Sequence, residues 1–138
     1  MCIRDRYGSG PARIVAATIE QTADEQGIAW PRSLAPWQVH LVALGKAGTP
    51  ERDAGEELYA ELLAAGIEVV FDDRAGGAGE KFADAGLLGG PVRLTVGRRT
   101  LEDGLVEAQG RRGQVALDPV PLREGAPAAV EALLREAP

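Results

Sequence analysis

Apolar side chains recur every three or four positions in several stretches of this chain, which is the spacing of an amphipathic helix. Thr49 and Pro50 precede the longest of these stretches and Gly66 follows it, as Gly27 follows the first. Threonine is a common capping residue, proline suits the first turn of a helix, and glycine often stands just after the last one. The pattern predicts helices at 11–23, 50–65 and 80–88, and a last helix that carries Val130, Leu133 and Leu134.

Between these stretches lie shorter apolar runs with the length of buried strands. They are QVHLVAL at 38–44, IEVVF at 67–71, VRLTVG at 92–97, and a hairpin-like pair formed by LVEAQ at 105–109 and QVALDPV at 114–120. Alternation of strand and helix implies parallel pairing with right-handed crossovers, and the last pair adds antiparallel pairing. The pattern predicts an α/β fold: a three-layer α/β/α domain with a mixed, mostly parallel sheet of about five strands, preceded by one separate helix.

A segment with two prolines in eight residues, WPRSLAPW at 30–37, separates the first helix from the alternating strands and helices. Such a segment favours an extended linker, and its two tryptophans are expected to pin it to a neighbouring surface. We therefore divide the chain into residues 7–32, a helix with its linker, and residues 33–138, the α/β domain. Residues 1–6, MCIRDR, have no periodic pattern, and we expect them not to be native to a chain that continues upstream.

Composition narrows the classes of function. The 138 residues are 45% apolar, enough for one core, yet no apolar run approaches the length of a membrane span and no secretory signal is present. One cysteine and one histidine exclude an internal disulfide framework and a multi-histidine metal site, and they fit a reducing cytoplasm. We expect His40, in a predicted strand, to be a buried residue with its hydrogen bonds satisfied. The net charge of −6 argues against a general nucleic-acid coat protein, but not against a local contact.

The first candidate for chemistry is YGSGPAR at 7–13. Gly8 and Gly10 would let a phosphate approach the start of a helix, and Arg13 lies one turn into it. A dinucleotide fingerprint needs a third glycine where Arg13 stands, and a phosphate loop needs a Gly-Lys-Ser/Thr ending. From these residues alone, a tight helix entry with a solvated arginine is the simpler interpretation, and a grip on a phosphate tail is the alternative.

The second candidate is FDDRAGGAGEKFAD at 71–84. Asp72, Asp73 and Arg74 stand at the carboxyl end of a predicted strand, where ligands gather in parallel sheets, and Lys81 follows a glycine-rich loop. Neighbouring strand residues point to opposite faces, so the two aspartates do not form an acid/base or metal pair. An ordinary polar connection and the phosphoacceptor aspartate of a receiver domain are the alternatives, although residues 45–50 lack the further acids of a receiver.

Taken in order, these segments resemble the C-terminal end of the bacterial-type prolyl-tRNA synthetases. YGSGPARIVAATIEQ is similar to motif 3 of the class II aminoacyl-tRNA synthetases, and DEQGIAWPRSLAPWQVHLVAL to the passage from catalytic core to anticodon-binding domain. FDDR, GEKFADAGLLGGPVRLTVGRR and LVEAQGRR resemble the body of that domain. Threonyl, glycyl and histidyl enzymes share the domain, whereas the WP…AP linker together with FDDR…KFAD points to proline. The resemblance runs from Tyr7 to the end of the chain.

The resemblance implies a role for the first candidate. Arg13 would be the motif 3 arginine that holds the terminal phosphate of ATP, and Gly8 and Gly10 would let the nucleotide approach. The intact enzyme uses ATP with Mg²⁺ and is a homodimer in the cytoplasm, and its motifs 1 and 2 lie upstream. We therefore expect this chain alone to be monomeric, to need no cofactor, to form no prolyl-adenylate, and to have neither DNA nor a membrane as a partner.

The resemblance also implies that the α/β domain binds the anticodon loop of the proline tRNA. Anticodons for proline end in two guanines, whose O6 and N7 suit an arginine and whose N1–H and N2–H suit a carboxylate. Bases of a single-stranded loop can be read on these edges. The candidate anticodon-binding residues are Asp72, Asp73, Arg74, Lys81, Phe82, Asp84, Arg98 and Arg99, with Lys81, Arg98 and Arg99 expected on phosphates.

Two positions depart from the family. The family usually has glutamate at the position of Gly86 and a branched apolar residue at the position of Gly90. We therefore expect a looser helix around Gly86 and a looser turn around Gly90. Two other functions stay open: a stand-alone RNA-binding accessory module, and a flavodoxin-like small-molecule or receiver domain.

Overall fold

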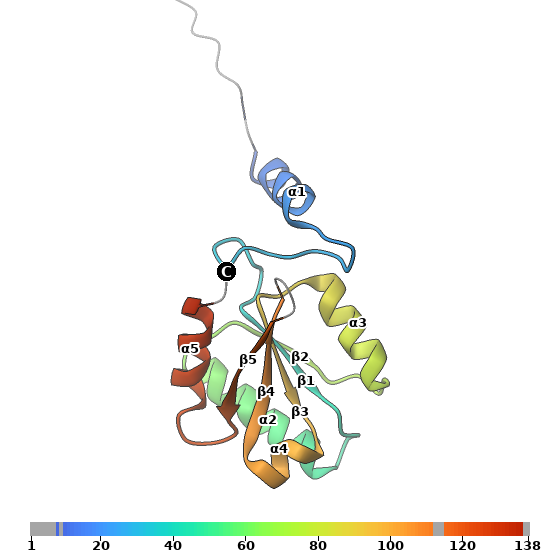
Figure 1. Ribbon diagram of the computed structural model, residues 1–138, viewed down its shortest axis with the longest axis vertical. Helices are drawn as coiled ribbons and strands as arrows, with labels where there is room; N and C mark the ends of the chain where they lie inside the picture. The colour runs from blue at the N-terminus through green and yellow to red at the C-terminus, as the bar shows by residue number, and fades with distance from the viewer. Residues whose placement is uncertain (1–7, 9, 112–114, 137–138) are drawn as a thin grey trace, which may run out of the picture.

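The computed structural model describes residue 8 and residues 10–111 and 115–136, so the expectation about residues 1–6 lies outside it. Figure 1 shows the elements in chain order from blue to red. They are α1 (Pro11–Thr22), β1 (Val39–Ala43), α2 (Pro50–Ala64), β2 (Val69–Asp72), α3 (Ala78–Leu88), β3 (Val92–Val96), α4 (Arg98–Asp103), β4 (Leu105–Gly110), β5 (Ala116–Pro121) and α5 (Ala126–Glu136).

The five strands form one mixed sheet, as predicted, and their order in it is β2-β1-β3-β4-β5. β1 pairs in parallel with both β2 and β3, whereas β3–β4 and β4–β5 are antiparallel. Two of the four pairings are thus parallel, and β4 alone of the five strands runs in the opposite direction. The register shifts between Val106 and Ala108, opposite Val120 and Leu117 of β5.

The core lies between the sheet and the two helices α2 and α5, which pack on the same face (Figure 1). Val39 and Leu41 of β1 point into it, with Leu58 and Leu62 of α2 opposite and Leu134 of α5 beside them. α3 covers the other face, mainly over β1, so that β1 is buried along its whole length. In β4 burial alternates instead, because the face of β4 turned away from the core has no helix over it.

The local predictions were mostly close. The first helix ends at Thr22, one residue before the predicted end, and residues 24–27 form a tight turn. The short helix α4 was not anticipated; it fits between Gly97 and Gly104, which leaves the helix at a φ of 69°. α3 runs through Gly86 to Leu88, the predicted end, and begins two residues earlier than predicted. Gly90 gives the Trp37 indole its space, since a Cβ there would lie 2.5 Å from Nε1.

Candidate nucleic-acid interface

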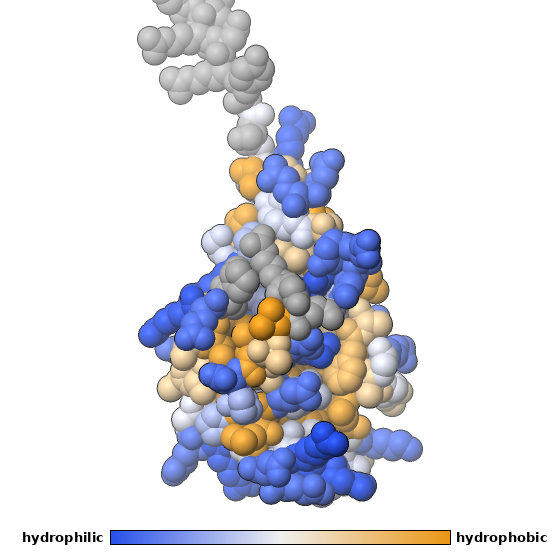
Figure 2. Space-filling view, in the orientation of Figure 1, coloured by the Kyte–Doolittle hydropathy of each residue, from blue (hydrophilic) through white to orange (hydrophobic). Residues whose placement is uncertain are grey.

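The carboxyl ends of β1, β2 and β3 meet at one edge of the sheet, because these three strands are parallel. The loops after β1 and β2 line a cavity of about 600 Å³, and the segment after β3 lines another of about 490 Å³. Exposed Leu44, which follows β1, lines both cavities, so they lie on either side of the end of β1. The structure therefore places the candidates after β2 and after β3 on one surface. Figure 2 shows hydrophilic side chains at the end of the molecule that carries α4, with apolar ones next to them.

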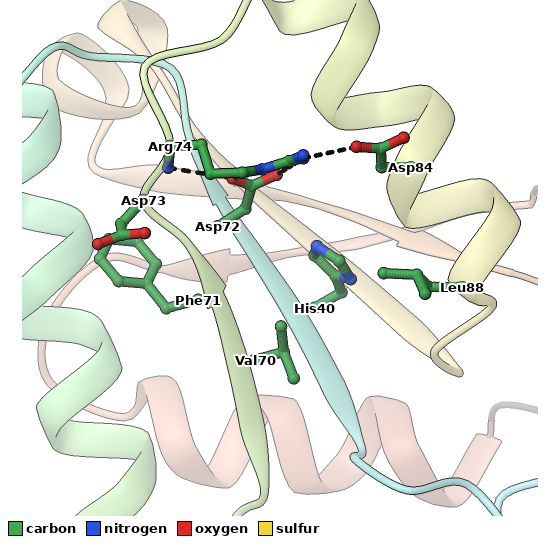
Figure 3. A pocket seen from close by; sticks show the side chains of 8 residues that line it. All are labelled: His40, Val70, Phe71, Asp72, Asp73, Arg74, Asp84 and Leu88. Carbon is green, nitrogen blue, oxygen red and sulfur yellow. Dashed lines mark hydrogen bonds and ion pairs between the residues drawn. The ribbon is translucent and has the colours of Figure 1, made fainter.

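Arg74 links the end of β2 to α3 (Figure 3). Its Nε and Nη2 donate to the two carboxylate oxygens of Asp72 at 3.0 and 2.8 Å, and Nη2 also lies 2.7 Å from Asp84 Oδ2. The hydrogen bonds from Arg74 lower the pKa of Asp72, although burial opposes them. The same two carboxylates raise the pKa of the guanidinium above its usual value.

Asp72 does not have the accessibility that a base-reading carboxylate needs. Its side chain is 4% exposed and both oxygens are bonded to Arg74, whose own side chain is 52% exposed. Asp72 thus positions Arg74, and neither of its carboxylate oxygens faces a ligand. The prediction that Asp72 reads a base is therefore corrected. Asp73 points to the other face, as predicted, where its carboxylate is exposed and lies 3.3 Å from Arg52.

The prediction that Lys81 contacts a phosphate is also corrected. The side chain is 1% exposed, and its ammonium donates to the carbonyl of Ala43 at 2.7 Å and of Asp72 at 3.3 Å. These carbonyls lie at the ends of β1 and β2, so the lysine joins α3 to both strands from inside the domain. A phosphate outside cannot reach it.

A cavity of about 440 Å³ lies between β2 and the flank of α3 that carries Asp84 and Leu88 (Figure 3). Val70 and His40 form its floor, and Arg74 with Asp84 closes one end. His40 is buried as predicted, but neither of its nitrogens has a hydrogen-bond partner within the described part of the chain. Burial lowers the pKa of His40, so the imidazole is neutral at neutral pH.

The opposite flank of α3 carries an aromatic ring paired with a cation. The Arg93 guanidinium lies over the Phe82 ring, with its carbon 4.4 Å from the ring centroid, and Nη2 donates to Oε1 of Gln109. Burial lowers the pKa of Arg93. Beside them Gly86 leaves open space, since a Cβ there would meet nothing within 4 Å. We call Phe82, Arg93 and Gln109 the base platform.

Sequence reasoning selected Phe82 but missed Arg93 and Gln109. A signal was present, because Arg93 is the one charged residue of a strand whose other residues are mostly apolar. Such a residue must face away from the core, and the pairing of Arg93 with Gln109 in the antiparallel β3–β4 ladder puts both on the uncovered face.

Arg98 and Arg99 are exposed at the start of α4, the helix that directly follows β3. The hydroxyl of Thr100 accepts a hydrogen bond from the backbone N–H of Gly97 at 3.1 Å and so fixes the entry to this helix. The two guanidiniums therefore project from an anchored turn at the edge where the parallel strands end.

Gly8, Gly10 and Arg13 are far from this edge in sequence and are exposed. A Cβ at either glycine would meet nothing within 4 Å, and α1 has no buried residue. These three residues do not by themselves enclose a nucleotide.

Two further kinds of feature, a metal site and a membrane-spanning helix, are absent from the described residues. They contain no group of three or more histidine, cysteine, aspartate or glutamate side chains placed to hold a metal ion. Nor do they include a helix whose length and apolar content would let it cross a bilayer.

The five-stranded α/β fold, with arginines and an aromatic platform around an uncovered sheet face, is typical of a domain that binds nucleic acid. Residues 38–130 match the family described as the anticodon binding domain, and this chain belongs to that family. The match begins at the residue before β1 and ends within α5, so it includes the whole sheet.

The chain is similar in sequence to proteins named proline–tRNA ligase. The chain is 47% identical over 128 residues to a proline–tRNA ligase of Moorella thermoacetica, which covers 93% of this chain and 22% of that protein. It is 47% identical over 106 residues to a proline–tRNA ligase of Bacillus subtilis, covering 77% and 19%. The chain therefore spans about a fifth of the length of these relatives.

A solved structure agrees with both. The prolyl-tRNA synthetase of Cryptosporidium parvum, complexed with L-proline and AMP, superimposes with a TM-score of 0.74 at 25% identity. The similarity covers 91% of this chain and 28% of that one, so α1 and its linker are included in part with the α/β domain.

Proposed function

We propose that this chain is the C-terminal part of a proline–tRNA ligase and that its α/β domain binds the anticodon loop of the proline tRNA. The parent enzyme would activate proline with ATP and transfer it to this tRNA, in the cytoplasm and as a homodimer. The observation that carries the proposal is the match of residues 38–130 to an anticodon-binding family, in a chain whose relatives are proline–tRNA ligases.

The base platform offers the contact that an RNA loop needs first. Unstacked bases bind well on aromatic rings and on guanidinium planes, and Phe82 and Arg93 provide one of each in contact. Gln109 lies beside them and accepts a hydrogen bond from Arg93 through its Oε1, which helps to fix the guanidinium over the ring. Gly86 places no side chain beside them, and a Cβ there would meet nothing within 4 Å.

Groups that discriminate guanine lie on the other side of α3 and at the sheet edge. Arg74 keeps an exposed face while Asp72 and Asp84 hold its guanidinium, which pre-organises its donors for O6 and N7. Asp73 and Asp84 remain partly exposed and could accept from N1–H and N2–H. Arg98 and Arg99 are the cations assigned to phosphates.

Residues 7–32 would belong to the catalytic core of the parent enzyme, and residues 33–138 would form the anticodon-binding domain. Support comes from α1, where Ile14 and Val15 are exposed although they are apolar. A catalytic core would cover them and would add the remaining contacts to ATP and Mg²⁺ around Arg13. Because Gly8, Gly10 and Arg13 do not enclose a nucleotide, we assign no step of proline activation to this chain alone.

The test is a titration of the chain, at one fixed salt concentration, with a hairpin of the proline anticodon stem and loop and with a hairpin whose two guanines are replaced. We expect tighter binding of the first, by about 1–3 kcal/mol for each guanine that is read. The Arg13→Met variant is the matched control, since it removes one exposed arginine far from the interface and should keep the preference. Equal affinities for the two hairpins would refute anticodon reading and favour a general RNA-binding module.

A further inference from the structure

The turn that follows α1 is in backbone contact with the C-terminal end of α3. Asp24 and Gly27 exchange two backbone hydrogen bonds, of 2.9 and 3.2 Å, and the Gln26 N–H donates to Asp24 Oδ1 at 2.9 Å. Gly27 has a φ of 132°, and a Cβ there would lie 2.6 Å from the Cα of Leu87. Only glycine permits this approach.

The next residues complete the end of α3. The last carbonyls of a helix have no partner inside it. Here the Ile28 N–H donates to the carbonyl of Leu87 at 3.0 Å, the Trp30 N–H to that of Gly89 at 3.2 Å, and the Trp30 indole to that of Leu88 at 3.1 Å. Residues 28–30 therefore act as the C-terminal cap of α3, although they precede the domain in sequence.

Arg111 joins this turn to the surroundings of the base platform. Its Nη1 and Nη2 donate to the two carboxylate oxygens of Asp24 at 2.8 and 2.7 Å, and its Nε donates to the carbonyl of Gly86 at 2.9 Å. The Arg111 side chain is 5% exposed, against 47% for Asp24. A small cavity of about 20 Å³ has Arg111 and Gly86 on its walls together with Arg93 and Gln109.

We propose that Arg111 is a positioning residue that couples occupancy of the base platform to the docking of residues 24–30. The proposal rests on the proposed function, since the coupling needs RNA on the platform. Arg111 holds the turn with one end of its guanidinium and the carbonyl of Gly86, next to the platform, with the other. A change at either end alters what the other end can bond.

The direction of the coupling follows from burial. Without the Asp24 carboxylate, the nearly buried guanidinium would keep only the Gly86 carbonyl among the bonds described above, and an incompletely paired buried charge is unfavourable. Arg111 would then turn toward water and release both the turn and Gly86. A base that orders the platform around Gly86 favours the opposite state, in which Arg111 reaches Asp24, and such coupling acts equally in both directions.

Because α1 ends at Thr22, two residues before Asp24, the docked turn also sets the direction in which α1 leaves the domain. RNA on the platform would thus stabilise one orientation of the helix that carries Arg13.

The experiment uses the full chain and the proline anticodon hairpin. Hydrogen exchange of the Ile28 and Trp30 amides and the Kd of the hairpin are measured for the wild type, Asp24→Asn and Arg111→Lys. Glu25→Gln is the control, because it removes the neighbouring exposed charge. Exchange at Leu94, a buried strand residue, reports whether each variant keeps its fold.

We expect the hairpin to slow exchange at Ile28 and Trp30 in the wild type. Asp24→Asn should exchange faster there without RNA and bind the hairpin about fivefold more weakly, at the lower end of the range for coupled sites. Arg111→Lys keeps the positive charge but loses the two-pronged contact with the Asp24 carboxylate. It should likewise exchange faster at Ile28 and Trp30 and bind the hairpin more weakly. Glu25→Gln should change neither the exchange nor the Kd. If Arg111→Lys does not fold, Asp24→Asn decides, since Asp24 lies outside the core.

Failure of the coupling and failure of the proposed function give different results. If the wild type does not bind the hairpin, both are overturned. If it binds but exchange at Ile28 and Trp30 stays the same, the coupling alone is overturned. The same holds if Asp24→Asn exchanges faster yet binds RNA as the wild type does, because that is the result of a purely structural contact.

Discussion

On the flank of α3 that faces β2, the Arg74 guanidinium bonds two carboxylates, whereas on the flank that faces β3 the Arg93 guanidinium lies on the ring of Phe82 and bonds a neutral amide. The first flank has its charges mutually satisfied and fixed in place. The second presents flat surfaces with open space beside them. One helix thus separates a set of oriented polar groups, suited to discrimination, from a stacking surface, suited to affinity.

The face of α3 between the two flanks supports both, and its loss should have the largest effect. Lys81→Ala would remove the buried ammonium that bonds the carbonyls of Ala43 and Asp72, and would leave a cavity. We expect a loss of about 3 kcal/mol in the free energy of unfolding, from the unpaired carbonyls and the cavity together. Urea denaturation measures it, with Glu80→Ala, on the exposed neighbouring position, as the control. A loss below about 1 kcal/mol would show that the lysine does not hold the flanks together.

The two flanks should differ in what their loss does to RNA binding. Phe82→Ala should weaken binding of the proline anticodon hairpin and of the guanine-replaced hairpin alike, by about 1–3 kcal/mol, because stacking is tolerant of sequence. Arg74→Met should instead reduce the difference between the two hairpins, because a guanidinium reads O6 and N7 of guanine. Titrations of both variants with both hairpins check this. The distinction fails if Phe82→Ala removes the preference and Arg74→Met leaves it intact.

The smallest expected effect is on the stability of the fold at low pH. Bonding to Arg74 lowers the pKa of Asp72 in the folded protein below that of the unfolded chain, about 3.9. The stabilisation is therefore complete above that unfolded value and is lost as pH falls through the folded one. Thermal unfolding followed from about pH 5 to about pH 2 should show a shallower loss of stability for Asp72→Asn than for the wild type. Parallel curves for the two proteins would assign the acid sensitivity to other groups.

The sequence alone was enough to predict the helices and strands whose hydrophobic periodicity is strong. The strands at the centre of the sheet and the helix α2 were predicted close to their observed bounds, although the Thr49 hydroxyl donates to the carbonyl of Lys46 instead of capping α2. α4 was missed because six residues between two glycines contain too few turns for a period to appear. The position of Asp72, Asp73 and Arg74 at the carboxyl edge followed from strand direction alone.

The roles of individual side chains were harder to predict, because they depend on contacts distant in sequence. Lys81 looked like a surface cation, since lysine is seldom buried, yet two strand ends 38 and 9 residues away supply its acceptors. Asp24 and Arg111 are 87 residues apart, and no local pattern connects them. His40 was predicted to have partners, and only the packing around it showed that burial had not brought any from the described residues.

The last strand has a consequence for assembly. β5 forms an outer edge of the sheet. Pro119 lies where its register with β4 shifts, and Pro121 lies opposite Leu105. Proline has no N–H to offer a neighbour, so these two positions cannot donate to a sixth strand from another chain. These prolines therefore oppose edge-to-edge aggregation on this side of the sheet.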